Sequence, residues 1–200
     1  MSTPDQPQHR GDSMVSAELL HMRITIIPFM LERIAAARHA LELEKRHGIL
    51  DYVELFRAGT QDERLLYTVL GGYTQPVTSI AAIQCRVLLE FLGLTTSKAT
   101  PGRLASIREK RRVGDIGIEC FADREGNQFK RLTRDCALAL VHGPIRAECA
   151  WTTVIEFANQ RLAHATDDHR LGGKSVRPHL YNAFRTVPRL VENAFLDRLE

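Results

Sequence analysis

Two groups of polar side chains interrupt otherwise apolar helical segments, and they are the residues best suited to chemistry. In residues 77–92, Ser79, Arg86 and Glu90 fall on one narrow stripe at about 100° per residue. The other side chains there are nearly all apolar, which is typical of a buried helix. We expect Arg86 and Glu90 to be partly buried and paired, because a lone buried charge is costly. Either the pair fixes the helix register, or it lines a groove that presents Arg86 to an anion.

The second group lies at the end of a predicted helix over residues 144–165. Asn159 and His164 lie off its apolar face, and Asp168, His169 and Arg170 follow directly. A protonated histidine near a helix C-terminus is stabilised by the macrodipole, and histidine also suits acid–base catalysis. If these residues form a site, we expect it to face the Arg86/Glu90 stripe across one polar cavity. The candidate catalytic residues are His164, Arg170, Asn159 and Arg86.

Metal binding is the remaining interpretation of the second group. His164, Asp168 and His169 are ligand types, but their spacing is less specific than His-Glu-x-x-His. No matching carboxylate motif occurs on another predicted helix, so a di-metal bundle is not supported. We predict no metal and no cofactor.

Positive charge gathers in residues 103–112. The net charge of the chain, +3, is too small to imply nucleic-acid binding by itself. Within this stretch, however, five cations face only Glu109. They are interpreted either as a solvated surface or as a contact to RNA. The cations are Arg103, Arg108, Lys110, Arg111 and Arg112.

The cysteines and the N-terminal residues point to a cytoplasmic protein. The four cysteines include no Cys-x-x-Cys pair, so they are predicted to be small buried side chains in a reducing compartment. Residues 1–13 are polar and unlike a secretory signal. The most apolar stretch, 24–31, is far shorter than the ~20 residues that a membrane-spanning helix needs. We expect no membrane contact.

The hydrophobic periodicity predicts an all-α fold. After a disordered leader over 1–13, a period of 3.6 residues continues through a single helical domain, 14–200. We expect a bundle of about six or seven helices, more than 60% helix, no sheet beyond a stray bridge, and a buried Trp151. Thr60 and Glu63 match a capping box that would start one of the helices. The predicted helical segments are 16–27, 28–47, 49–57, 60–70, 77–92, 115–122, 127–142, 144–165 and 179–199.

Several of these segments resemble an uncharacterised, mostly bacterial all-helical family that is distantly similar to the HEPN superfamily. The resemblance is carried by Ala82 with residues 85–92, by residues 159–164 with Arg170, and by Asp115. HEPN bundles often dimerise, and many are ribonucleases that use an arginine and a histidine four to six residues apart. The resemblance therefore implies a HEPN-like up-and-down core, a homodimer and ribonuclease-like chemistry.

Three classes of function follow from these observations. The leading expectation is a helical interaction or scaffold protein without catalysis. The first alternative is a HEPN-like protein that binds or cleaves RNA with the His164/Arg170/Arg86 cluster. The second alternative is a bundle that binds a metal or a small molecule.

Overall fold

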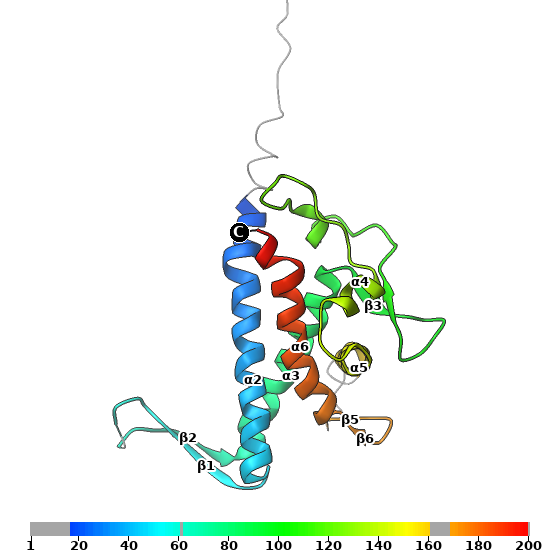
Figure 1. The fold of residues 1–200 in the computed structure, drawn as a ribbon. Coiled ribbons are helices and arrows are strands. Elements are labelled where there is room, and N and C mark those ends of the chain that lie inside the picture. The colour runs from blue at the N-terminus through cyan, green and yellow to red at the C-terminus, as the bar shows by residue number, and fades with distance from the viewer. Residues whose placement is uncertain (1–16, 61, 161–168, 200) are drawn as a thin grey trace, which may run out of the picture.

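The chain is predominantly helical, as predicted. The computed structural model describes residues 17–60, 62–160 and 169–199, and of these 57% are helical and 13% are in strands (Figure 1). The helical fraction falls slightly short of the expected 60%. Three two-stranded antiparallel sheets contradict the expectation that no sheet would form. The described residues contain five named α-helices, so a bundle of six or seven is not confirmed.

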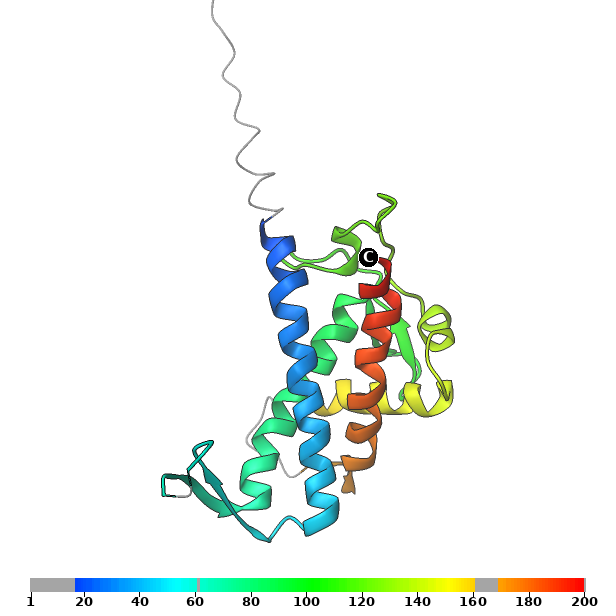
Figure 2. The same ribbon diagram turned by 60° about the vertical axis from the view of Figure 1, so that its left-hand side comes forward.

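Three long helices run side by side and a fourth crosses them. Helix α2, Ile27–His47, continues from a helical turn over 17–21 and a π-helical segment, Met22–Ile26. It packs against α3, Leu70–Phe91, and α6, Arg177–Ala194. Helix α5, Pro144–Gln160, crosses this layer and packs on α3 and α6 (Figure 2). The end of the predicted 144–165 helix lies outside the described residues.

Helix α3 begins seven residues earlier than the periodicity indicates. Gly71, Gly72 and Pro76, which predict a break, lie inside it. The reason is a contact with the segment before the arm: the amides of Leu70 and Gly71 donate to the carbonyls of Asp51 and Ile49, at 2.7 and 2.8 Å. These hydrogen bonds satisfy amides that a helix start leaves without partners.

The segments 49–57 and 60–70, predicted as helices, instead form a β-hairpin. Strand β1, Tyr52–Phe56, pairs antiparallel with β2, Arg64–Val69, and a bulge lies between Leu55 and Phe56. Their β-branched, aromatic and leucine side chains suit a strand, and an isolated helix of nine residues is marginal in water. Thr60 does not cap a helix; its hydroxyl donates to the carbonyl of Arg57. We call this hairpin, residues 52–69, the arm; it projects away from the helices (Figure 1).

The second hairpin belongs to the body of the protein. Strand β3, Leu94–Thr96, pairs with β4, Leu104–Ser106, and both contact α5. The third pairs β5, Arg170–Leu171, with β6, Lys174–Ser175. The predicted helices 115–122 and 127–142 shorten to a 3₁₀ turn, Ile118–Cys120, and to α4, Arg134–Ala139. A last 3₁₀ turn, Leu196–Arg198, follows α6.

The core lies where α3, α5 and α6 meet. Trp151 of α5 is fully buried, which confirms its prediction, and its indole N–H donates to Thr186 Oγ1 at 2.8 Å. At one end of the bundle, Phe91, Phe121 and Phe195 make edge-to-face contacts with ring centroids 4.9–5.9 Å apart. Such contacts add about 0.5–1.5 kcal/mol each beyond simple burial. The core therefore fixes the helices from which the arm extends.

Candidate functional site

The predicted Arg86–Glu90 pair forms. Arg86 donates to Glu90 Oε1 from Nη2 at 3.0 Å and from Nε at 3.3 Å. The two side chains are 33% and 35% exposed, so the pair is half-buried rather than enclosed. Ile80, Ile83 and Val87, on the same helix, are exposed, which explains why α3 is less buried than its composition indicates.

The remaining candidate catalytic residues are not gathered around this pair by any described contact. Asn159 is exposed at the end of α5, and Arg170 is exposed on β5. His164 lies outside the described residues. The neighbour of Arg170, His169, is within 3.4 Å of Ser79 on α3, two turns or about 10 Å along the helix from Arg86. A shared site therefore stays a prediction.

Within the basic stretch 103–112, Arg111 points inward. Its Nη2 donates to the carbonyls of Glu90 and Phe91 at 2.8 and 2.9 Å, and its Nε donates to Glu119 at 2.9 Å. A Cβ at Gly117 would lie 2.2 Å from this guanidinium, so a larger residue there would displace the Arg111 side chain. Arg111 therefore ties the end of α3 to the loop that follows β4.

Glu119 is the anion at the centre of this contact. Partial burial acts to raise the pKa of its carboxyl, but hydrogen bonds from Arg111, from its own backbone and from Arg131 outweigh burial and lower the pKa. Arg131 also donates to the carbonyls of Ile107 and Glu109 at 3.1 and 2.7 Å. The cluster holds the loop in place, and its arginines are engaged in structure.

At the opposite end of the bundle, a polar cluster that the sequence did not reveal joins three helices. Glu44 of α2 is 7% exposed. Its carboxylate accepts from Thr74 of α3 and, at 2.9 Å, from Arg177 Nε of α6. Because a buried carboxylate is costly without partners, this cluster fixes the three helix ends relative to one another.

A second buried polar group lies beside this cluster. His169 is almost fully buried, with its Nε2 3.4 Å from the hydroxyls of Thr78 and Ser79 and its ring edge-on to Phe157. Its φ of 52° is left-handed, which is uncommon for a residue other than glycine. The backbone there is held by the hydrogen bond from the Val176 amide to the His169 carbonyl, 3.0 Å long.

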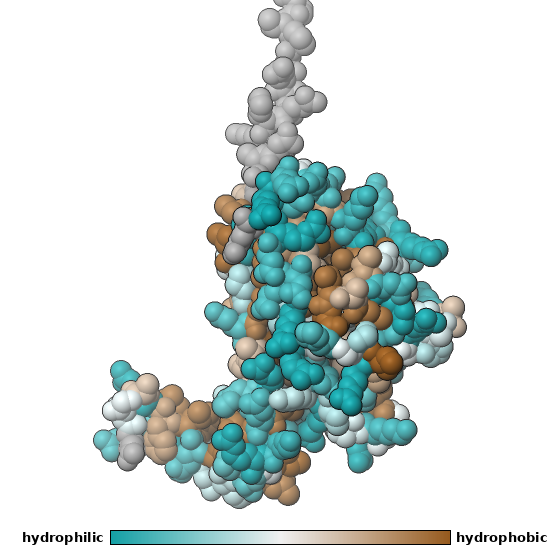
Figure 3. Space-filling model, viewed as in Figure 1, coloured by the Kyte–Doolittle hydropathy of each residue, from teal (hydrophilic) through white to brown (hydrophobic). Residues whose placement is uncertain are grey.

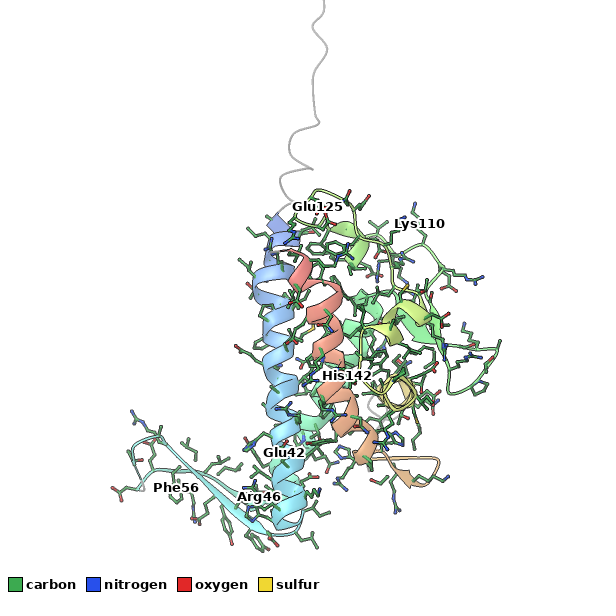
Figure 4. The ribbon with its side chains drawn as sticks, in the orientation of Figure 1. Glu42, Arg46, Phe56, Lys110, Glu125 and His142 are labelled. Atoms are coloured by element: carbon green, nitrogen blue, oxygen red, sulfur yellow. The ribbon has the colours of Figure 1, made fainter. Side chains whose placement is uncertain are left out.

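A cavity of about 840 Å³ opens beside Glu44 and Arg177. It lies between the end of α2 and the start of α6, and Ile49, just before the arm, also lines it. Figure 4 labels two more of its residues, Glu42 and Arg46, on the last turns of α2 near the root of the arm. Its size is within the range of about 300–1,000 Å³ that small-molecule sites occupy.

The arm presents two different faces. Side chains alternate along a strand, so the pairing Leu55↔Leu66 and Val53↔Thr68 puts these four on one face, which carries no charged side chain within β1 and β2. The opposite face carries stacked Tyr52 and Tyr67, with centroids 5.3 Å apart, together with the ion pair of Arg64 and Glu54. Figure 3 shows hydrophobic atoms along much of the arm.

The cysteines differ from their prediction. Only Cys85 is buried, and burial raises the pKa of its thiol far above the ordinary value. Cys120, Cys136 and Cys149 are exposed. Cys149 Sγ lies 3.7 Å from His179 Nδ1, a contact between α5 and α6 that sequence spacing gave no sign of.

Within the described ranges, no three His, Cys, Asp or Glu side chains gather closely enough to hold a metal ion. No helix in this part of the chain combines the length and the apolar character needed to cross a bilayer. Comparisons with protein-family models, curated proteins and solved structures find no match. The HEPN resemblance therefore stays a prediction.

Proposed function

We propose that this chain is a helical interaction protein that pairs with a second copy of itself through the arm. The observation that carries the proposal is the exposure of large apolar side chains on a projecting two-stranded ribbon. Leu50, Tyr52 and Leu65 are 76%, 70% and 64% exposed. A two-stranded hairpin is marginally stable alone in water, and contiguous exposed apolar surface is typical of an interaction site.

The apolar area exposed over both faces of the arm and its root is, in total, of the size that one partner contributes to a dimer. Nine large side chains on the arm and its root, taken at about 200 Å² each, leave roughly 900 Å² exposed. A standard protein–protein interface uses about 800 Å² on each partner. The nine are Ile49, Leu50, Tyr52, Leu55, Phe56, Leu65, Leu66, Tyr67 and Tyr73.

The charges and the strand edges of the arm suit an identical partner. Arg64 pairs with Glu54 at 2.9 Å and Arg57 with Glu63 at 3.1 Å, so these four charges do not repel a second arm. Both strands have an open edge in this two-stranded sheet. A two-fold axis brings two copies of one strand together antiparallel, which is self-complementary pairing. Two helical bodies would then be held by one central arm contact, as a scaffold requires.

Sedimentation equilibrium tests this proposal. We expect the wild type to reach a mass twice that of the 22.6 kDa chain at micromolar concentration. The variant Leu55→Asp/Leu66→Asp, which charges the uncharged face, should stay at 22.6 kDa with unchanged helical circular dichroism. Ile145→Asp is the matched control, because Ile145 is an exposed apolar residue on α5, and it should remain a dimer. A monomeric wild type would overturn the proposal, even if its arm binds a different protein. A dimeric Leu55→Asp/Leu66→Asp variant would overturn it as well.

RNA binding is the second candidate function, and one observation favours it. Arg108, Lys110 and Arg112 are exposed, and their side chains make no hydrogen bond or ion pair with any described residue. Fluorescence anisotropy with a single-stranded RNA tests it. Replacing all three with glutamine should weaken binding and flatten its salt dependence, because each phosphate contact releases counterions. Binding that does not change with salt would exclude this candidate.

A further inference from the structure

The cavity beside Glu44 and Arg177 carries an inference that goes beyond self-association. Its acidic side chains have hydrogen-bond partners within the protein, whereas its basic side chains keep unused donors. Both carboxylate oxygens of Glu44 already accept hydrogen bonds, from Thr74 and Arg177. Glu42 accepts from the Tyr181 hydroxyl at 3.3 Å and lies 3.9 Å from Arg38. The acidic groups of the cavity therefore have partners within the protein.

The basic groups of the cavity keep donors to spare. Arg177 uses only its Nε on Glu44, and its two terminal nitrogens make no hydrogen bond to a described residue. Lys45 and Arg46 also line the cavity, and their side chains have no described partner. The fork of an arginine matches a carboxylate with two parallel hydrogen bonds. The unused donors thus select an anion.

Apart from Asn182, the rest of the lining is mainly apolar. Leu41, Ile49 and Pro178 line the cavity together with Tyr181. Small-molecule sites typically combine such apolar walls with a few polar groups that fix orientation. We propose that the cavity binds an organic carboxylate with an apolar body, its carboxylate on the terminal nitrogens of Arg177 and its body against Leu41 and Ile49.

Isothermal titration calorimetry with three probes of equal chain length tests the proposal. Decanoate, decanol and decylamine are titrated into the full chain below their aggregation concentrations. We expect decanoate to bind once per chain and at least tenfold more tightly than the other two. Equal binding of decanol would show an apolar groove without anion recognition. No decanoate binding at millimolar concentration, or preferred binding of decylamine, would also overturn the proposal.

A conservative variant shows whether Arg177 provides the recognition. Arg177→Lys keeps the charge beside Glu44 but removes the fork, so decanoate affinity should fall at least tenfold while the fold is retained. Arg189→Lys, on the same helix and outside the cavity lining, is the matched control and should bind as the wild type does. If Arg177→Lys does not fold, Ile49→Ser provides a second test and should also weaken decanoate binding. Unchanged affinity in the folded variant contradicts the assignment.

This test can be separated from the proposed dimer, although Ile49 belongs to both surfaces. The Leu55→Asp/Leu66→Asp variant leaves every residue that lines the cavity in place. It should bind decanoate with wild-type affinity even when it is monomeric. Loss of binding in this variant would show that the cavity is not a site of the single chain, and would contradict the inference as stated.

Discussion

Two β-hairpins in this helical protein use similar residues in opposite ways. The β3–β4 hairpin buries Leu94 and Leu104 completely or nearly so against the body. Glu148 of α5 anchors strand β4, because its carboxylate accepts a hydrogen bond from the Leu104 amide at 3.1 Å. Arg134 in turn donates a hydrogen bond to Glu148. The arm has comparable apolar side chains, but Leu65 faces solvent. Folding of one chain explains the first hairpin; for the second, we propose association with a second copy.

The largest expected difference between the hairpins is in core stability. Leu94→Ala should lower the free energy of unfolding by roughly 2–5 kcal/mol, because it leaves a cavity in a packed core. Leu65→Ala should change it by no more than about 0.5 kcal/mol in dilute protein. Urea unfolding followed by circular dichroism measures both. A comparable loss from Leu65→Ala would mean that the arm packs on its own body.

The next effect concerns the helix ends from which the arm leaves. Arg177→Ala removes the only described cation on the buried Glu44 carboxylate and should cost about 3 kcal/mol. Arg189→Ala, on an exposed part of the same helix, should cost less than about 0.5 kcal/mol. Thermal unfolding of the two variants compares them. Equal unfolding temperatures for the two variants would show that the buried Glu44 carboxylate does not need Arg177 for the stability of the fold.

Acid should weaken the anchor of the β3–β4 hairpin. The hydrogen bonds from Arg134 are the main cause that lowers the pKa of Glu148, against a smaller opposing effect of burial. A carboxyl whose pKa is lower in the folded state contributes stability above its unfolded value of 4.5, and this is lost as pH falls through the folded value. Glu148→Gln should therefore flatten the fall in stability measured between pH 6 and 3. An unchanged pH profile would contradict this role.

The smallest effect is expected at the pair predicted from sequence. Arg86→Ala should cost about 1 kcal/mol or less, because both side chains are one-third exposed and such pairs are screened by solvent. The half-buried Arg111, which binds two carbonyls and Glu119, should matter more. Chemical denaturation of Arg86→Ala and Arg111→Ala ranks them. A larger loss of stability from Arg86→Ala than from Arg111→Ala would mean that the Arg86–Glu90 pair is shielded from solvent.

Local patterns predicted local features well. The i,i+4 spacing of Arg86 and Glu90 predicted their ion pair, and the apolar face around Trp151 predicted its burial. Gly48, the residue directly after the predicted helix 28–47, ends α2 with a φ of 88°. These features depend on residues within one or two helical turns, which the sequence displays directly.

Contacts between distant residues were missed. Glu44 and Arg177 are 133 residues apart, and nothing in either segment indicates that they meet. The sequence predicts two helices where the arm forms, because short apolar runs suit both helix and strand until the pairing of β1 with β2 is known. The arm and the cavity both depend on such contacts between distant residues.

Hydrogen exchange at two protein concentrations tests the central claim most directly, because it reports on both hairpins in one experiment. We expect amides of β3–β4 to be equally protected in dilute and concentrated protein. Amides of the arm should exchange rapidly when dilute and become protected when concentrated, as a second copy covers them. Arm amides that exchange at the same rate at both concentrations, in a range where β3–β4 stays protected, would contradict association through the arm.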